Sequence, residues 1–142
     1  MKKIIVAVDG SPSGMHAADM AAQLAQASGA ELTVATSVVP IAYPSVMMLP
    51  STLDFDAAQA RTAAMILADA QKRIGGNHPA LKVSTRSLQG QPAEAVAELA
   101  ANEKADLVVV GSRGRGALAR AFLGSVANRL VHACTRPVLV VR

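Results

Sequence analysis

Five short aliphatic runs alternate along the chain with four segments whose apolar residues recur at helical spacing. Such alternation predicts a parallel α/β sheet with a helix between successive strands. The first, fourth and fifth runs are continuously aliphatic, as strands covered on both faces should be. The third alternates partly with polar residues and is expected at an edge of the sheet. The expected strands are residues 4–8, 32–39, 81–88, 107–110 and 138–141.

The expected helices have recognisable ends. Ser11 is suited to cap the first helix, with Pro12 at its first position and Gly29 after its last. Ser125, which follows Gly124, is the expected N-cap of the fourth helix. The expected helical ranges are 12–28, about 54–74 with two glycines after it, 92 to about 104, and 126 to a point before residue 137.

The length of 142 residues suits one domain spanning residues 1–142, which is long enough to bury a core without disulfides. Hydrophobic residues make up 51% of the chain, but it has no Trp, two Phe and one Tyr, so the core is expected to be aliphatic and rich in alanine. The single cysteine excludes an internal disulfide and fits a reducing compartment.

No part of the sequence is suited to export or to membrane insertion. The apolar stretch 4–8 is shorter than the roughly seven residues that the core of a signal peptide needs. No uncharged apolar run approaches the roughly 20 residues of a transmembrane helix. We therefore expect a cytoplasmic protein that does not bind membranes.

The net charge of +4 is unevenly distributed. After Asp106 the chain contains six arginines and no acidic residue, so its basic last part favours an anion site. The alternative is a solvated basic face. Nucleic acid is not expected as a partner, because nucleic-acid surfaces more typically carry stacking aromatics, of which this chain has few.

Right-handed crossovers require the chain to add strands on one side of the first strand and then to move to its other side. The sheet therefore has a switch point between the first and fourth strands, and ligands of open α/β sheets bind at the carboxyl ends of the strands at such a point. The loops there are DGSPSG, residues 9–14, and GSRGRG, residues 111–116.

The stretch 111–126, GSRGRGALARAFLGSV, places Gly111, Gly114 and Gly124 ahead of Ser125 and a helix. Glycine permits positive φ and lets a ligand approach the main chain, whose N–H groups then bind an anion. A helix N-terminus adds N–H donors and partial positive charge, so a polyphosphate is the ligand that fits. The alternative is that the glycines serve only turns and helix packing. The chain has no Gly-Lys pair and hence no Walker A loop.

Other residues near the switch point allow two interpretations each. Asp9 is suited to bind Mg²⁺ or the adenine amino group, or only to cap the following turn. Arg113 and Arg115 are suited to pair with phosphate, although at least one is expected to be only solvated. The long connection 40–52 is either a surface loop or a lid over a ligand. Four further residues are expected to be structural or to lie at the surface: His16, His78, His132 and Cys134.

Three segments resemble the universal stress protein family, specifically the subgroup with the G-x2-G-x9-G-[ST] nucleotide loop. They are KKIIVAVDGSPSG (2–14), DLVVVGSRGRGALARAFLGSVANRLV (106–131) and PVLVV (137–141). The resemblance implies a doubly wound α/β domain with five parallel strands in the order 3-2-1-4-5 and helices on both faces. It also implies dimerisation, binding of ATP (or ADP or AMP) with Mg²⁺, and a regulatory role under stress.

The resemblance implies a role for each matching position. Asp9 would lie near the nucleotide or its metal ion. Val38 would meet the adenine through its backbone, although Ser37 stands where many members have His. The glycines after the fourth strand would border the ribose and the phosphates, and the start of the fourth helix would hold the phosphates. The expected nucleotide-binding residues are Asp9, Gly10, Ser11, Val38, Gly111, Ser112, Arg113, Gly114, Gly124, Ser125 and Val126.

We expect an ATP-binding regulatory protein that hydrolyses ATP slowly or not at all. One alternative is a slow ATPase or phosphotransferase that uses Asp9 and Mg²⁺, but the loops offer no His, Lys or second carboxylate to activate water. Another is a dimeric interaction module without nucleotide. The last strand, Val138–Val141, is aliphatic on both faces yet ends the chain, so its free edge is expected to pair with a second copy.

Overall fold

The computed structural model describes residues 1–39, 50–114 and 123–142, and only the backbone of residues 50–54. Strands and helices alternate in the order that the sequence predicts. The elements are β1 (Lys3–Ala7), α1 (Pro12–Ser28), β2 (Glu31–Val38), α2 (Pro50–Asn77), β3 (Val83–Gln89), α3 (Pro92–Asn102), β4 (Leu107–Gly111), α4 (Ser125–Ala133) and β5 (Val138–Val141).

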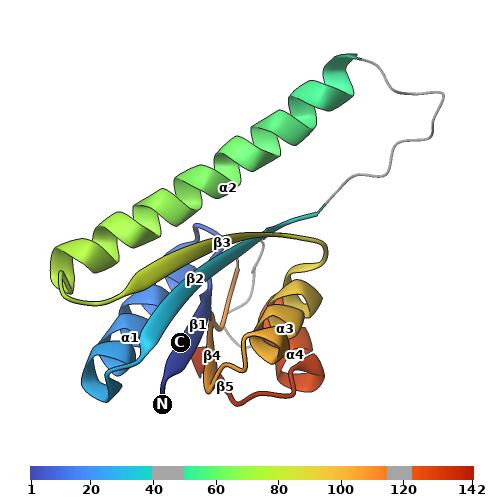
Figure 1. The fold of residues 1–142 in the computed structure, drawn as a ribbon. Coiled ribbons are helices and arrows are strands. Elements are labelled where there is room, and N and C mark those ends of the chain that lie inside the picture. Colours follow the sequence, from blue (N-terminus) through green and yellow to red (C-terminus); the bar gives the residue numbers. More distant parts are fainter. Residues whose placement is uncertain (40–49, 115–122) are drawn as a thin grey trace.

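The five strands form one parallel sheet in the order β3-β2-β1-β4-β5 (Figure 1). This order confirms the prediction. β1 is central, and its Ile4 pairs with Leu32 of β2 and with Leu107 of β4. β3 lies at one edge, as its partly polar pattern predicted, and β5 lies at the other.

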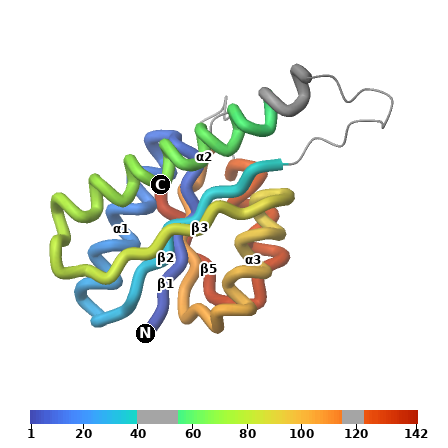
Figure 2. Tube along the Cα trace, turned by 45° about the horizontal axis from the view of Figure 1, so that its top comes forward, coloured from blue at the N-terminus to red at the C-terminus, as the bar shows by residue number. Residues whose placement is uncertain are grey.

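Helices α1 and α2 cover one face of the sheet, and α3 and α4 cover the other (Figures 1 and 2). Side chains alternate between the faces along a strand, so Ile4 and Val6 pack with α1 and α2, whereas Ile5 packs with α3 and α4. Burial of each of these side chains contributes about 1.5–3 kcal/mol. Fully buried alanines let α1 lie close to the sheet: Ala17, Ala18, Ala21, Ala22 and Ala25.

Both ends of α1 agree with the prediction. The Ser11 Oγ accepts the N–H of Gly14 at 3.1 Å, and Pro12 is the first helical residue. Gly29 closes the helix with a left-handed φ of 68°, and its N–H bonds to the carbonyl of Ala25. These caps fix where the helix begins, directly after the switch-point loop.

Other boundaries differ from the prediction. Helix α2 begins earlier than expected and continues through Gly75 and Gly76. The buried side chain of Ile74, 1% exposed, anchors this end of the helix, and its burial outweighs the roughly 1 kcal/mol that a helical glycine costs. Helix α3 ends before the expected Lys104, whose φ of 53° is incompatible with a continuing helix. Strand β3 begins later than predicted, at Val83.

The N-cap of α4 is Gly124, so the prediction that Ser125 fills this position is wrong. Gly124 has an extended backbone, with φ −61° and ψ 154°, and its carbonyl accepts the N–H of Asn128 at 2.9 Å. Ser125 is therefore the first helical residue. Because the cap residue is a glycine, it offers no side chain to bond to the first N–H groups of α4.

Helix α2 extends well past the sheet at its N-terminal end (Figure 1). Its first residues, 50–52, belonged to the predicted connection 40–52; residues 40–49 lie outside the described residues. The choice between a surface loop and a lid therefore stays a prediction. No described helix, α2 included, combines the length and the apolar character needed to cross a membrane.

Candidate functional site

The carboxyl ends of β1 and β4 lie side by side, and the sheet continues through β2 on one side and through β5 on the other. This is the predicted switch point. The loop after β1 leads into α1 on one face, whereas the chain after β4 leads to α4 on the opposite face (Figure 1). The residues of both loops are therefore brought together at the carboxyl ends of the central strands.

Asp9 begins the loop after β1, and its side chain lies between this loop and the loop after β4. Its Oδ1 accepts the N–H of Ser11 at 3.0 Å and the Ser11 hydroxyl at 2.5 Å. A Cβ added to Gly14 would come within 2.8 Å of Oδ1, and one added to Gly114 would come within 2.9 Å of Oδ2. Asp9 thus performs the turn-capping role that the sequence allowed, and its carboxylate also faces the β4 loop, where a ligand is expected.

The glycines of the β4 loop allow neighbouring segments of the chain to approach closely. Gly111, Gly114 and Gly124 all lack the positive φ that the sequence argument allowed for, and Gly10 in the β1 loop has it instead, at 78°. A Cβ on Gly124 would lie 3.2 Å from the carbonyl oxygen of Ser112. The glycine spacing therefore lets the two ends of the β4 loop pack against each other and against Asp9.

Gly111 has a structural task, because a Cβ there would lie 2.7 Å from the backbone C and O of Ser13 on α1. We expect Gly111→Ala to lower the free energy of unfolding by about 2 kcal/mol, since backbone must move to relieve the overlap. Gly75→Ala is the control: nothing lies within 4 Å of its Cβ position, so it should be neutral or stabilising by up to about 1 kcal/mol. Urea denaturation measures both. Equal stability of the two variants would contradict this role.

Ser112 ties the loop together through its backbone. Its N–H donates to the carbonyl of Val141 at 2.6 Å, and its carbonyl accepts the N–H of Gly124 at 2.7 Å. Ser112 is 6% exposed. The start of α4 is thereby held beside the end of β4, although the residues between them, including Arg115, lie outside the described residues.

The start of α4 presents backbone donors without a capping side chain. Within the described structure no side chain caps this helix, in contrast to α1, which Ser11 caps. The N–H groups of Ser125, Val126 and Ala127 precede the first intrahelical bond, so they are available to an anion, and the helix dipole adds partial positive charge. Ser125 is exposed and contributes a hydroxyl. This end of α4 fits a phosphate group.

Strand register changes the expectation for Val38. Its carbonyl accepts the N–H of Gly90 at 2.9 Å, and in a parallel ladder both backbone groups of one residue bond to the same neighbouring strand. Val38 therefore turns its backbone toward β3. The next residues on either side, Ser37 and Val39, turn theirs across the end of β1, and Val39 is 40% exposed. Which residues of β2 face β1 and which face β3 depends on the strand register, and the sequence alone does not indicate it.

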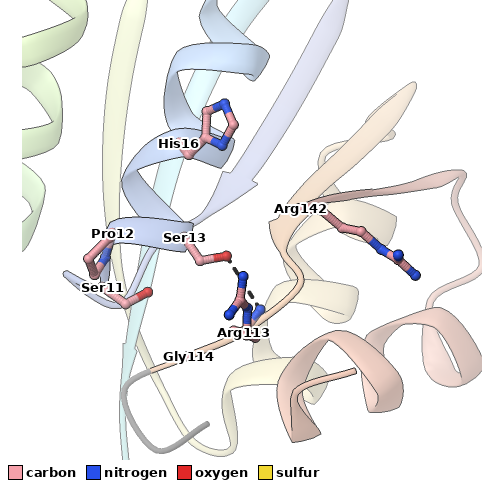
Figure 3. Close-up of a pocket in the computed structure, with 7 residues that line it drawn as sticks. All are labelled: Ser11, Pro12, Ser13, His16, Arg113, Gly114 and Arg142. Carbon is pink, nitrogen blue, oxygen red and sulfur yellow. Dashed lines mark hydrogen bonds between the residues drawn. The ribbon is translucent and has the colours of Figure 1, made fainter. Parts of the chain in front are cut away.

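Ser11, Arg113 and Gly114 line a cleft of about 380 Å³ on the α1 side of the β4 loop (Figure 3). The backbone N–H of Arg113 lies 3.4 Å from the Ser13 hydroxyl, which joins the loop to α1. His16 and Arg142 also line the cleft. Neither residue could be recognised from the sequence as a neighbour of the β4 loop, because no local motif connects the first helix with the residue after the last strand.

Two of the histidines that were expected to be structural have local partners. His78 contacts Gln26, and His132 contacts the carbonyl of Asn128, in agreement with a structural role. Across residues 1–39, 50–114 and 123–142, no group of three or more His, Cys, Asp and Glu side chains is placed to hold a metal ion.

The model of the universal stress protein family matches residues 1–142. The chain belongs to this family. The family assignment confirms the resemblance seen in the β1 and β4 segments, whereas membership of the nucleotide-loop subgroup stays a prediction.

Curated relatives and solved structures agree with the assignment. A universal stress protein of Thermus aquaticus is 37% identical over 141 residues, covering 99% of this chain and 98% of its own. One from Mycobacterium tuberculosis strain H37Rv is 37% identical, with 99% and 95% covered. A crystallised universal stress protein in complex with cAMP is 33% identical, with TM-score 0.76 and 99% and 97% covered. That of Lactobacillus plantarum is 26% identical, with TM-score 0.88 and the same coverage.

Proposed function

We propose that this universal stress protein binds an adenine nucleotide at the switch point, with its phosphates at the start of α4. The observation that carries the proposal is the uncapped N-terminus of α4, which Ser112 holds beside the β4 loop through Gly124. A relative that is 33% identical was crystallised with cAMP, an adenine nucleotide, which supports this ligand class.

The remaining groups of the site are assigned from their positions. The base would lie over the end of β1, where Ser37 and Val39 direct backbone groups and Val39 adds exposed apolar surface. Asp9 would face the nucleotide or its Mg²⁺ from the β1 loop, with Gly10 and Ser11 shaping that loop. Gly114 and Gly124 would leave room for the ribose and the phosphates. Gly111 would let the start of the β4 loop pack against α1.

Calorimetry tests the proposal directly. Titration of the purified protein with ATP and Mg²⁺, ADP, AMP and cAMP should show saturable binding. GTP should bind more weakly, because in the proposed site the β2 backbone, or Asp9, would pair with the adenine amino group, which guanine replaces with a carbonyl. Mass spectrometry of any ligand released on denaturation identifies the nucleotide that the protein carries from the cell. Absence of binding by every adenine nucleotide would leave a dimeric interaction module as the function.

We expect ATP to be held rather than turned over. Apart from Asp9, the described loop segments 10–14, 111–114 and 123–126 contain no His, Lys or carboxylate that could activate water. The Oδ1 of Asp9 is already bonded twice to Ser11. Donors that bind the ground-state phosphates do not by themselves lower the barrier, because only interactions stronger in the transition state do so.

Single-turnover conversion of bound, labelled ATP should therefore be far slower than about 1 per second, a rate typical of the slower enzymes. Asp9→Asn is the matched variant, because the amide oxygen can still accept the Ser11 bonds while the negative charge is removed. Similar slow rates in both proteins are expected. Turnover at about 1 per second or faster, lost in Asp9→Asn, would establish the ATPase or phosphotransferase alternative.

We further propose that the protein is a homodimer paired through β5. This strand is an edge of the sheet, and its first three residues are only half-buried. A short apolar edge invites pairing with another strand, and a second copy supplies an identical, self-complementary one. A dimeric nucleotide-holding protein with little turnover suits a regulatory role under stress.

A further inference from the structure

The outer edge of β3 presents backbone groups that the sheet does not use (Figure 1). Leu32 of β2 donates its N–H to the carbonyl of Lys82. At the other end of the ladder, Gly90 donates its N–H to the carbonyl of Val38. In a parallel ladder both backbone groups of one residue bond to the same neighbouring strand, so the even-numbered residues of β3 face β2. The groups that point outward, and that no described strand pairs with, are those of Val83, Thr85, Ser87 and Gln89.

This edge is suited to pair with an identical edge. β3 has seven residues, whereas β5, the other edge of the sheet, has four. A long free edge is a template for another strand. A second copy of this chain supplies the same outward groups, and antiparallel pairing about a two-fold axis makes the contact self-complementary. Overlap of all seven residues places that axis at the middle residue, Arg86.

Arg86 makes this self-pairing unfavourable. At the axis, the Arg86 side chains of the two copies would stand directly opposite each other. Because the backbone of Arg86 faces β2, the two residues would form a pair without hydrogen bonds, with Cα atoms about 4.5 Å apart and side chains close together. Like charges in this position are destabilising. Other registers separate the two arginines only by shortening the overlap.

Arg86 also occupies an acceptor that a pairing strand would need. Its Nη1 donates to the carbonyl of Thr85, one of the outward groups, at 3.1 Å. The Nε of Arg86 lies 3.5 Å from the carboxylate of Glu103, at the end of α3. This carboxylate also pairs with Lys3 of β1 at 2.7 Å, and the Glu103 side chain is only 17% exposed. Glu103 is therefore a fixed partner that holds the guanidinium against the edge of β3.

We propose that Arg86 blocks the edge of β3 against pairing with a second copy of this chain. Its charge opposes the fully overlapping register, and its guanidinium competes for the Thr85 carbonyl. Charged side chains protect free edges in many sheets. The consequence for assembly rests on the proposed dimer through β5: a sheet with one open and one blocked edge stops at two copies. Two open, self-complementary edges would instead join copies into a continuing row.

Arg86→Thr is the test, because threonine lacks the charge and the reach of arginine and is well suited to a strand. Sedimentation velocity from micromolar to submillimolar concentration should show species larger than those of wild type. Removal of the opposed charges should strengthen association through β3 by at least about tenfold. Arg129→Thr is the matched control, because it removes an exposed arginine that pairs with Glu94 at 3.8 Å but lies on α4, away from any strand edge. It should assemble as wild type does.

Hydrogen exchange locates the new contact. The outward amides of Thr85 and Ser87 should exchange more slowly in assembled Arg86→Thr than in wild type, while circular dichroism stays unchanged. Three results would overturn the proposal: wild-type assembly of Arg86→Thr, equal assembly of Arg129→Thr, or assembly without protection of these amides. If wild type is a monomer and Arg86→Thr forms pairs, the block at β3 is supported and the dimer through β5 is rejected. The two proposals therefore fail separately.

Discussion

Replacing Ser125 with glutamate should weaken ATP binding by at least about a hundredfold, which corresponds to roughly 2.7 kcal/mol. The carboxylate would stand at the first position of α4, beside the uncapped N–H groups that we propose bind the phosphates. Two like charges about 4 Å apart repel by about 4 kcal/mol at the dielectric of a protein surface. The glutamate would also compete for the same backbone donors.

The same substitution should leave the fold intact, which makes the result interpretable. Ser125 is exposed, and a negative side chain in the first turn of a helix is favourable by about 0.3–1 kcal/mol. Thr135→Glu is the matched control, because it adds the same charge at an exposed position beyond the other end of α4. Calorimetry with ATP and Mg²⁺ compares the three proteins. Equal affinity for ATP in all three proteins would show that the phosphates do not bind at the start of α4.

The fold could be predicted because its signals are local and repeated. Continuous aliphatic runs such as residues 4–8 require cover on both faces, and right-handed crossovers then leave one switch point. Ser11 and Gly29 are found at the predicted caps because capping depends on a few neighbouring residues. The ends of α2 could not be predicted in this way, because burial of Ile74 against the sheet overrides the local preference of two glycines.

The place of the candidate loops at the switch point could be predicted, whereas the contacts that their residues make could not. The spacing of Gly111, Gly114 and Gly124 marked a loop that the fold brings to the switch point, yet none of the three has the positive φ that glycine permits. Their purpose depends on what each Cα approaches, such as Ser13 for Gly111, and those neighbours are distant in sequence. The direction of the Val38 backbone likewise depends on register with β3. Tertiary distances of this kind have no signature in one sequence.

The free edge of β5 has a defined pattern of backbone groups. Val108 donates its N–H to the carbonyl of Pro137 and Ser112 donates to Val141, so odd-numbered residues of this strand bond to β4. The N–H and carbonyl groups of Val138 and Val140 therefore point outward, away from the sheet. Pairing with a second β5 would use these groups.

Val140→Pro should convert the proposed dimer into a folded monomer. Proline removes the outward N–H and places its ring on the pairing edge, and it is tolerated on edge strands whose N–H faces solvent. Val140→Thr is the control, because it keeps the N–H and the branched shape. Light scattering at micromolar concentration should give a dimer for wild type and Val140→Thr and a monomer for Val140→Pro, with helical content unchanged by circular dichroism. A dimeric Val140→Pro protein would show that β5 is not the interface, and a monomeric wild type would remove the dimer altogether.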